Sequence, residues 1–387
     1  MNLFLTGSTG FLGGELLINL SKRSEINKIY CLIRASSLAE ATLRLEHVFN
    51  VHGDFFDRNK VIPIMGNLFE DQLTELLITN KILQNNIDVI IHCAANTSFS
   101  RIYDDIVEKA NIGGLKKILL WAKQLPKLST FLYIGTATIC GKDIKNRVVK
   151  EEESPNLLAN HLVKYTYTKM QGEILLHQHL PEEKILIARP SIIMGDSRPL
   201  IPRSTVILWA LATINELRLI PVNQHAELDI IPVDYAAKAI VDLLFTKRNY
   251  NLYHISSGKA AATTLFKLTN TIAIHSNRKP PFHFVDKSML SQVKHWSKHN
   301  LKLDSPLHSY AEYLDYWEKN FLDASKLRIL IAGMDPYFEF IELGQVFDNS
   351  RLLSDLPIGN PKPADVYLDN CINFLEAIDI FEGALDS

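Results

Sequence analysis

Short apolar runs alternate with amphipathic stretches through the first half of the chain. The runs are rich in Ile, Val and Leu and lack polar alternation, which is typical of parallel strands covered on both faces. We expect strands over residues 3–6, 28–33, 61–65, 89–93, 130–135 and 184–188, separated by helices over 12–21, 38–50, 72–84, 106–124 and 165–177. This order predicts an α/β fold with a doubly wound parallel sheet, whose ligands bind at the carboxyl ends of the strands.

The regular alternation ends near residue 190. We expect a further strand–helix–strand unit over residues 228–231, 233–245 and 252–256, as the same sheet resumes after an insertion. The remaining sequence consists of aromatic-rich helices and polar loops. The pattern therefore predicts a Rossmann-type domain of residues 1–190 and 228–258. It also predicts a smaller, mostly helical substrate-binding lobe of residues 191–227 and 259–387.

Composition narrows the possible partners. The 387 residues carry a formal net charge of −2, which gives no electrostatic case for nucleic acid. The four cysteines are far apart and indicate reduced packing residues. No signal-like stretch precedes the first strand, and charges interrupt the most apolar window, residues 206–221. We therefore expect a cytoplasmic protein with no transmembrane segment. His295 and His299 have no third partner, so we expect no metal site.

A glycine-rich turn follows the first strand directly, at Thr6–Gly13. Gly7 permits a tight turn, Gly10 lets the backbone approach a phosphate, and Gly13 lets the next helix pack closely on the strand. The N–H groups at the start of that helix then face the anion. The segment predicts a pyrophosphate site, and the alternative is a tight strand–helix turn without a ligand.

Tyr165 and Lys169 open a predicted helix four residues apart, so they share one face. A phenol has a pKa near ~10, and a neighbouring ammonium lowers it by favouring the phenolate. Such a tyrosine can donate a proton to a carbonyl oxygen while a hydride reaches the carbon. The alternative is an ordinary exposed helix pair.

Polar or small residues follow two other predicted strands. Thr136 ends the fifth strand, where its hydroxyl can stabilise a developing oxyanion, although a turn cap is the alternative. Ala94, Ala95 and Asn96 leave room for a cofactor, or alternatively for close helix packing. Asn111 falls on the next helix, where its amide can anchor a water or a backbone carbonyl near Lys169; the alternative is an exposed asparagine.

Together, these features resemble the extended short-chain dehydrogenase/reductases, in the correct order along the chain. The resemblance implies that Tyr165 is the general acid/base, that Lys169 binds the ribose and tunes the pKa of Tyr165, and that Thr136 stabilises the oxyanion. It also implies a cofactor site made of the following residues: Gly7, Ser8, Thr9, Gly10, Phe11, Leu12, Gly13, Arg34, Asn67, Leu68, Ala94, Ala95, Asn96, Asn111, Tyr165, Lys169, Pro190 and Ser191.

A narrower group is also similar: the thioester reductases and fatty acyl-CoA reductases with a male sterility-type NAD(P)-binding domain. The similarity rests on Gly-Phe-Leu-Gly at 10–13, Cys-Leu-Ile-Arg at 31–34, His-Cys-Ala-Ala at 92–95, Glu173, Arg-Pro-Ser-Ile at 189–192 and Asp-Ile-Ile-Pro at 229–232. It covers residues 1–258 and fades beyond. One position departs from the pattern, because Thr138 stands where the group usually carries an aromatic residue.

The end of the second strand bears on which nicotinamide cofactor is used. NAD-preferring proteins usually place an acid there, to bind the ribose 2′-hydroxyl. This chain has Arg34, with no acid before Glu40. Because a guanidinium pairs well with phosphate, the sequence favours NADP(H) over NAD.

The leading hypothesis is an NADPH-dependent reductase of an acyl thioester, carried on coenzyme A or an acyl carrier protein, that yields an aldehyde or alcohol. One alternative is an alcohol or 3-hydroxysteroid-type dehydrogenase. A second is a nucleotide-sugar epimerase or dehydratase of the same fold, against which Arg34 argues. A third is a non-catalytic NADP-sensing protein, against which the retained Tyr165 and Lys169 argue.

Overall fold

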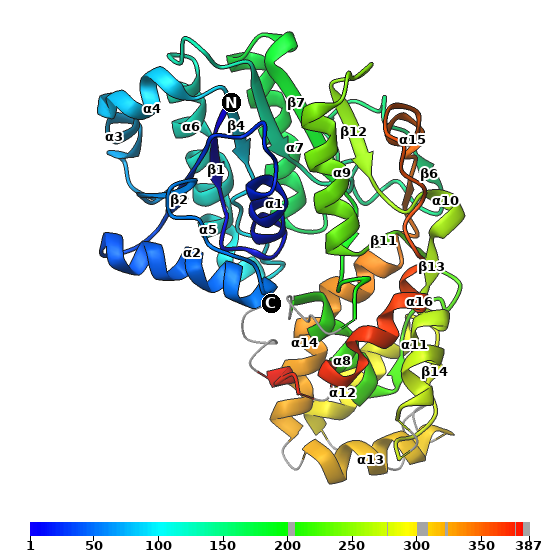
Figure 1. Cartoon of the computed structure of the whole chain (residues 1–387). Helices are drawn as coiled ribbons and strands as arrows, with labels where there is room; N and C mark the ends of the chain where they lie inside the picture. Colours follow the sequence, from blue (N-terminus) through cyan, green and yellow to red (C-terminus); the bar gives the residue numbers. More distant parts are fainter. Residues whose placement is uncertain (200–205, 277, 300–308, 322–323, 376, 382–387) are drawn as a thin grey trace.

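The computed structural model describes residues 1–199, 206–276, 278–299, 309–321, 324–375 and 377–381. A seven-stranded sheet in the order β12-β7-β5-β4-β1-β2-β3 forms one lobe of the molecule (Figure 1). All neighbouring pairs are parallel. The strands are β1 (Asn2–Thr6), β2 (Lys28–Ile33), β3 (Val61–Met65), β4 (Val89–His92), β5 (Thr130–Ile134), β7 (Ile185–Pro190) and β12 (Leu252–Ile255). The doubly wound fold is confirmed, with its topological switch point between β1 and β4.

Helices cover both faces of the sheet, so each strand is apolar on both sides. In β1, Leu3 and Leu5 join the apolar cluster under α1 (Phe11–Ser21), α2 (Leu38–His52) and α9 (Val233–Phe245). Phe4 points to the opposite cluster, under α3 (Leu73–Thr79), α4 (Lys81–Asn86), α6 (Gly114–Ala122) and α7 (Lys164–His179). This two-sided burial explains the continuous apolar runs of the sequence.

Two expected helices are interrupted. The helix expected over 72–84 breaks at Asn80, whose side chain accepts hydrogen bonds from the N–H groups of Ile82 and Leu83 and so begins α4. The helix expected over 106–124 consists of α5 (Asp104–Glu108), one π-helical turn (Lys109–Gly113) and α6. π-Helical turns occur often at functional sites, and this one contains Asn111.

The expected strand over 228–231 does not join the main sheet. β10 (Glu227–Leu228) pairs with β13 (Thr263–Thr264), whereas β11 (Ile230–Ile231) pairs with β8 (Ile192–Ile193). Asp229 lies between the two short strands, and its buried carboxylate accepts hydrogen bonds from the N–H groups of Ser257 and Phe347. These bonds hold the segment against the second lobe, so only β12 extends the sheet.

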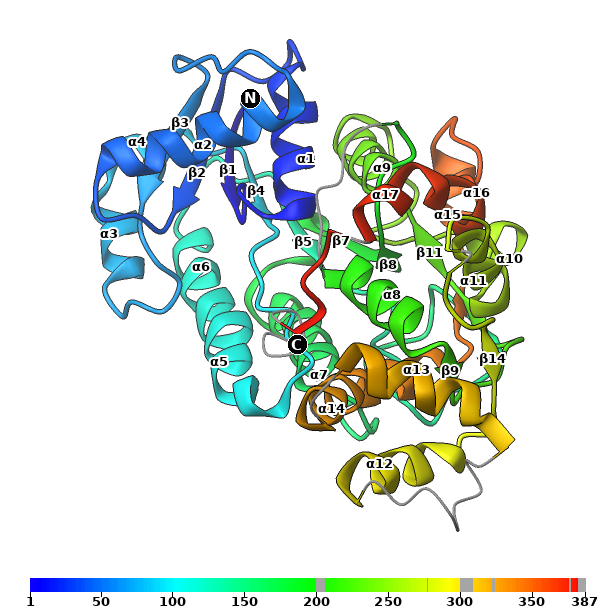
Figure 2. The same cartoon turned by 90° about the horizontal axis from the view of Figure 1, so that it is seen from below.

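The second lobe is largely helical and packs around an apolar cluster of its own. Its helices are α8 (Val206–Leu217), α10 (Gly258–Ala261), α11 (Leu265–Ile274), α12 (Met289–His299), α13 (Ala311–Phe321), α14 (Ala324–Ile341), α16 (Ala364–Tyr367) and α17 (Ile372–Leu375). Figure 2 shows α8 near the centre of the molecule, between the sheet and the layer of α13 and α14. A parallel pair is formed by β9 (Leu219–Ile220) and β14 (His283–Phe284).

Other short elements connect the two lobes. β6 (Val148–Val149) pairs with β15 (Val346–Phe347), and α15 (Ser350–Asp355) contacts β12. Leu352 and Leu356 therefore belong to the sheet-side cluster. Three 3₁₀ turns complete the described elements, at Arg101–Tyr103, Glu182–Lys184 and Leu368–Cys371. Among the helices of the described ranges, none has the length and apolar character needed to cross a membrane.

Candidate active site

A cavity of about 820 Å³ opens where the carboxyl ends of the strands meet the second lobe. It is lined by 17 of the cofactor-site and catalytic residues expected from the sequence: Gly7, Thr9, Gly10, Phe11, Leu12, Gly13, Arg34, Asn67, Leu68, Ala94, Ala95, Asn96, Thr136, Tyr165, Lys169, Pro190 and Ser191. These residues come from six strand ends and from α1 and α7, so the fold gathers in one place residues that are scattered widely along the sequence.

The glycine turn has the shape of an anion cradle. Gly7 adopts φ +76°, and a Cβ on it would lie 2.7 Å from the backbone nitrogen of Ala94. A Cβ on Gly13 would lie 1.9 Å from the carbonyl oxygen of Gly7. α1 begins after Gly10 with no side-chain cap and no acid in its first turn. Its first N–H groups therefore face the cavity without a competing side chain, as a pyrophosphate site requires.

A buried hydrogen-bond chain fixes the turn against the end of β4. The hydroxyl of Thr6 accepts a bond from the N–H of Ala94 at 3.1 Å and contacts Nδ1 of His92 at 3.1 Å. Burial lowers the pKa of His92 to about 3, so its ring is neutral and has one nitrogen that donates and one that accepts. Thr6 and His92 belong to the motifs at 6–13 and 92–95, but neither was among the site residues expected from the sequence.

Two residues expected to bind the cofactor lie behind the cavity wall. Ser8 is fully buried, and its hydroxyl lies beside the Cys31 thiol. Asn111 is 3% exposed; its amide oxygen accepts from the N–H of Asn96 at 2.8 Å and its amide nitrogen donates to Thr168 at 2.9 Å. Asn111 thus ties the loop after β4 to α7, and side-chain contact of either residue with a cofactor remains a prediction.

Lys169 is 3% exposed at the inner end of the cavity. Its ammonium donates a 2.6 Å hydrogen bond to the carbonyl of Ile134 and lies 5.9 Å from the centroid of the Tyr165 ring. Burial lowers the pKa of Lys169 to about 8, while the Cys93 thiol and the Glu173 carboxylate oppose that shift. The ammonium is therefore present at neutral pH and is lost at moderately alkaline pH.

The electrostatics of Tyr165 differ from the expectation. The sequence suggests that Lys169 lowers the pKa of the phenol, whereas burial raises the pKa of Tyr165 above its ordinary value. The apolar walls around the ring disfavour the phenolate. Phe99, which the sequence analysis did not single out, stacks on the Tyr165 ring at 6.5 Å. The phenol is thus held protonated at neutral pH, in the form that donates a proton.

Thr136 lies beyond the end of β5 and faces the cavity. Its hydroxyl oxygen lies 3.0 Å from that of Thr138, which also lines the cavity. Behind them, Glu173 and Arg189 form a buried two-pronged ion pair, with N–O distances of 2.9 and 2.7 Å. A Cβ on Gly135 would lie 3.0 Å from the Glu173 carboxylate, so this pair packs directly under the strand end.

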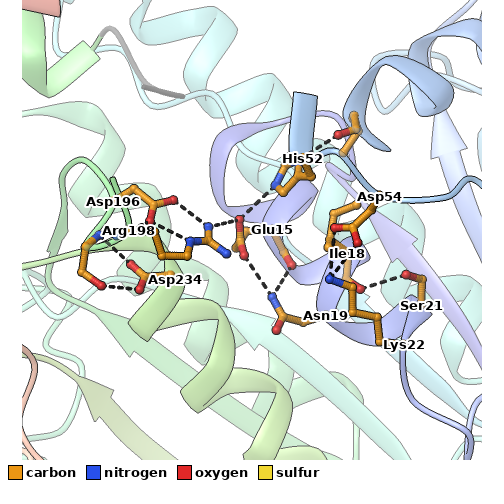
Figure 3. Close-up of polar contacts among 12 residues, drawn as sticks. Glu15, Ile18, Asn19, Ser21, Lys22, His52, Asp54, Asp196, Arg198 and Asp234 are labelled. Atoms are coloured by element: carbon orange, nitrogen blue, oxygen red, sulfur yellow. Dashed lines mark hydrogen bonds and ion pairs between the residues drawn. The ribbon is translucent and has the colours of Figure 1, made fainter. Parts of the chain in front are cut away.

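Helix α1, which follows the glycine turn, is also anchored to the second lobe (Figure 3). Glu15 on α1 is 1% exposed and accepts hydrogen bonds from Nε2 of His52 at 2.9 Å and from Nη2 of Arg198 at 3.0 Å. Asp196 in turn accepts two hydrogen bonds from the guanidinium of Arg198 and a third from its backbone N–H. Burial raises the pKa of Glu15, but the bonds from His52 and Arg198 outweigh it and bring the pKa to about 2.

The wall opposite the glycine turn is apolar and was largely missed by the sequence analysis. It combines residues of β8, α8, β10, β11, α11 and α14 with the residue that follows β8, all of which periodicity marks only as core: Ile192, Ile193, Met194, Ala210, Leu211, Ile214, Leu228, Ile230, Leu265, Leu268, Tyr337, Phe340 and Ile341. α8 thus contributes Ala210, Leu211 and Ile214 to the lining of the cavity. Within the described ranges, no group of three or more His, Cys, Asp and Glu residues is arranged to hold a metal ion.

Comparison with known proteins identifies the family. A model of an NAD-binding family, described as male sterility protein, matches residues 5–240. The chain belongs to this family. This match confirms the resemblance to the extended short-chain dehydrogenase/reductases with a male sterility-type NAD(P)-binding domain that the sequence motifs indicate.

Two relatives show how far similarity to individual proteins extends. Human fatty acyl-CoA reductase 1 is 26% identical over 300 residues, which cover 66% of this chain and 58% of the human protein. A linear gramicidin synthase of Brevibacillus parabrevis is 30% identical over 64% of this chain and 5% of its own length. The chain thus spans less than two thirds of the length of either relative.

Solved structures share the fold over nearly the whole chain. The terminal R domain from the myxalamid PKS-NRPS biosynthetic pathway has a TM-score of 0.71 and 20% identity, over 97% of this chain and 90% of that one. UDP-glucuronic acid 4-epimerase from Bacillus cereus, in complex with NAD, has a TM-score of 0.63 and 19% identity, over 97% and 99%. At 19–20% sequence identity, these similarities establish a shared fold.

Proposed function

We propose that this protein uses NADPH to reduce an acyl thioester to an aldehyde or alcohol. The observation that carries the proposal is a cavity that joins the glycine turn, the Tyr165–Lys169 pair, Thr136 and a long apolar wall. In this proposal residues 1–190 and 228–258 bind the nucleotide, and residues 191–227 and 259–387 bind the acyl group. The family relationship to fatty acyl-CoA reductases supports the reaction class.

The residues present fit a nicotinamide dinucleotide. The uncapped start of α1 and the glycine turn suit its pyrophosphate, and Asn67 and Leu68 lie where the adenine would be held. Arg34 is exposed at the rim of the cavity, and the Arg44 guanidinium donates to its carbonyl. The nearest acid in sequence, Glu40, is engaged by the N–H and hydroxyl of Ser36. This charge pattern favours a 2′-phosphate, hence NADP(H) over NAD.

The chain's own residues account for proton transfer. The bound cofactor supplies a hydride to the thioester carbon, which places negative charge on the carbonyl oxygen. Thr136 would donate a hydrogen bond to that oxygen and Tyr165 would give it a proton. Lys169 would hold the ribose while its ammonium stabilises the resulting phenolate. In the resulting hemithioacetal the hydroxyl proton would return to the Tyr165 phenolate as the C–S bond breaks, and the departing thiolate would take up a proton from solvent. An aldehyde and a thiol are released, so that one NADPH and one proton are consumed per thioester.

The apolar wall suits the acyl group of the substrate. Side chains from α8, α11 and α14 shape a surface on which a hydrocarbon chain can be buried at about 25 cal/mol per Å². The thiol carrier, coenzyme A or the phosphopantetheine of a carrier protein, would then remain toward the mouth of the cavity. The fold also occurs in a solved thiolation-reductase di-domain from an archaeal non-ribosomal peptide synthetase, with a TM-score of 0.67 and 22% identity.

Substitution of Tyr165 tests the proposal. Tyr165→Phe should lower NADPH oxidation with an acyl-CoA panel by about 100-fold or more, because it removes the proton donor. NADPH binding, followed by its fluorescence, should persist. The matched control is Tyr167→Phe on the same helix, since Tyr167 does not line the cavity and its hydroxyl accepts a bond from Gln171.

Two outcomes would contradict the proposal. The first is wild-type protein that neither oxidises NADPH nor releases thiol with any acyl-CoA or acyl-pantetheine. The second is a Tyr165→Phe variant that retains full activity. Release of tightly bound NAD on denaturation would point instead to the epimerase or dehydratase alternative.

A further inference from the structure

Thr138 occupies a position that neither the motif pattern nor the proposed mechanism uses. Beyond β5 the chain continues to pair with β7: the N–H of Gly135 donates to Ala188 at 2.8 Å and that of Ala137 donates to Pro190 at 2.9 Å. The backbone then leaves the strand direction, because Ala137 lies in a bend and Thr138 in a turn. Ala137 packs away from the cavity with Val149 and Phe347, whereas its two threonine neighbours both line the cavity.

The two hydroxyls contact each other at the reacting end of the cavity. Oγ1 of Thr136 lies 3.0 Å from Oγ1 of Thr138 and also receives the backbone N–H of Thr138 at 3.4 Å. Thr136 and Thr138 are 7% and 8% exposed. The pair is therefore shielded from bulk water, where a hydrogen bond between neutral groups has its greatest effect.

Proton counting shows what this contact can do. A hydroxyl has one proton to donate and two lone pairs that accept. If Thr136 donates to Thr138, its proton is not available to a substrate oxygen. If Thr138 donates to Thr136, the proton of Thr136 points to the cavity, and the bond it receives strengthens the bond it gives. The aromatic residue usual at this position in the similar reductases has no hydroxyl on its Cβ with which to donate in this way.

We propose that Thr138 is a positioning residue that donates its hydroxyl proton to Thr136 and thereby orients Thr136 toward the substrate oxyanion. The inference rests on the proposed function, because it assigns Thr138 to the same reduction. It concerns a two-hydroxyl relay, Thr138 to Thr136 to substrate oxygen, rather than a new contact with the substrate. The hydrogen bond from Thr136 to the substrate oxygen should be strongest when that oxygen carries negative charge.

The test compares four variants: Thr138→Val, Thr138→Ser, Thr136→Val and the double variant Thr136→Val/Thr138→Val. Thr138→Val should lower kcat about five- to tenfold, the weight of one hydrogen bond, with KM for hexanoyl-CoA within about twofold of wild type. Thr138→Ser should restore kcat, because it keeps the hydroxyl. The double variant should be no slower than Thr136→Val, since Thr138 acts only through Thr136.

Independent measurements keep the outcome unambiguous. NADPH affinity from fluorescence titration and the melting temperature should be unchanged in Thr138→Val, and Thr138→Ala repeats the comparison if the valine variant does not fold. The relay is wrong if the losses from the two single variants multiply in the double variant. It is also wrong if Thr138→Ser is as slow as Thr138→Val, or if only KM changes.

Failure of the proposed function gives results that can be distinguished from failure of the relay. If the wild type ignores hexanoyl-CoA but reduces hexanal or a ketone with NADPH, thioester reduction is excluded and the same four variants are compared with that carbonyl substrate. The relay is then tested by the same criterion, which is whether the double variant reduces that substrate no more slowly than Thr136→Val. If no carbonyl compound is reduced, there is no oxyanion for Thr136 to stabilise, and the relay is overturned together with the function.

Discussion

The buried ammonium of Lys169 leads to a specific pH dependence. Burial lowers the pKa of Lys169 to about 8, and Lys169 is the group proposed to hold the cofactor ribose. With that pKa, about 90% of the side chains are charged at pH 7 and about 10% at pH 9. We therefore expect kcat/KM for NADPH to be constant from pH 6 to 7.5, and to fall about tenfold by pH 9 and tenfold per pH unit beyond.

Neighbouring groups do not produce the same profile. Burial raises the pKa of Tyr165 above its ordinary value and raises the pKa of the Cys93 thiol to about 11, so both stay protonated up to pH 9. Loss of the folded state does not explain the alkaline fall either, because the contribution of Lys169 to folding stability changes with pH in the opposite direction. Because its pKa is lower in the folded chain than in the unfolded chain, the unfolded state binds more protons between pH 8 and 10.5, and this group makes folding more favourable as pH rises there.

The assay measures initial rates of NADPH oxidation at varied NADPH and saturating acyl-CoA, since kcat/KM for NADPH reports groups of the enzyme form that NADPH binds. Lys169→Arg serves as the control, because a guanidinium remains charged throughout the range. Its activity can be lower, but its profile should be flat to pH 9.5. A wild-type profile that is also flat to pH 9.5, or an arginine variant with the same alkaline fall, would refute the assignment to Lys169.

Three further predictions follow from the cavity and its supports. Gly13→Ala should weaken NADPH binding at least about 100-fold in a fluorescence titration, because its Cβ would lie 1.9 Å from the Gly7 carbonyl. Gly113→Ala, where a Cβ would meet nothing within 4 Å, should bind normally. Arg34→Ala should weaken NADPH binding about tenfold and leave NADH binding within twofold, and equal losses would contradict the 2′-phosphate contact. Glu15→Gln should lower the free energy of urea unfolding by up to about 3 kcal/mol at pH 7, from a carboxyl pKa of about 2. That deficit should shrink as pH falls from 4.5 toward 2, where the native carboxylate is protonated, and a deficit independent of pH would contradict the ion-pair account.

The sequence predicted the parts of the fold that local pattern controls. All seven strands of the main sheet were expected within two residues at each end, because strands buried on both faces form continuous apolar runs. The glycine turn was equally readable, since Gly7 and Gly13 occupy positions where a Cβ would strike backbone. The resemblance to the reductase family also rested on short motifs, and the family comparison confirms it.

Features that depend on tertiary contacts could not be predicted from the sequence. The break at residues 228–231 depends on Asp229 bonding to Phe347, more than 100 residues away. The apolar wall combines Phe99, α8 and Tyr337, whose periodicity indicates only core packing. The helix interruption at Lys109–Gly113 accompanies the bonds of Asn111 to Asn96 and Thr168. Each of these needs a partner that lies far off in the sequence.

The pKa of Tyr165 was misjudged for a related reason, and the correction bears on reaction direction. Helical spacing reveals the neighbouring Lys169 but not the apolar surroundings, whose desolvation favours the neutral form of both side chains. A protonated phenol is ready to give a proton, as reduction requires, whereas oxidation of an alcohol needs the phenolate. We therefore expect the ratio of NADPH-dependent reduction to NADP⁺-dependent oxidation to stay high from pH 7 to 9, because the phenol remains protonated throughout that range. A ratio that falls steeply between pH 7 and 9, measured with one aldehyde–alcohol pair and corrected for the proton in the overall equilibrium, would show that the phenolate forms there and would contradict the raised pKa.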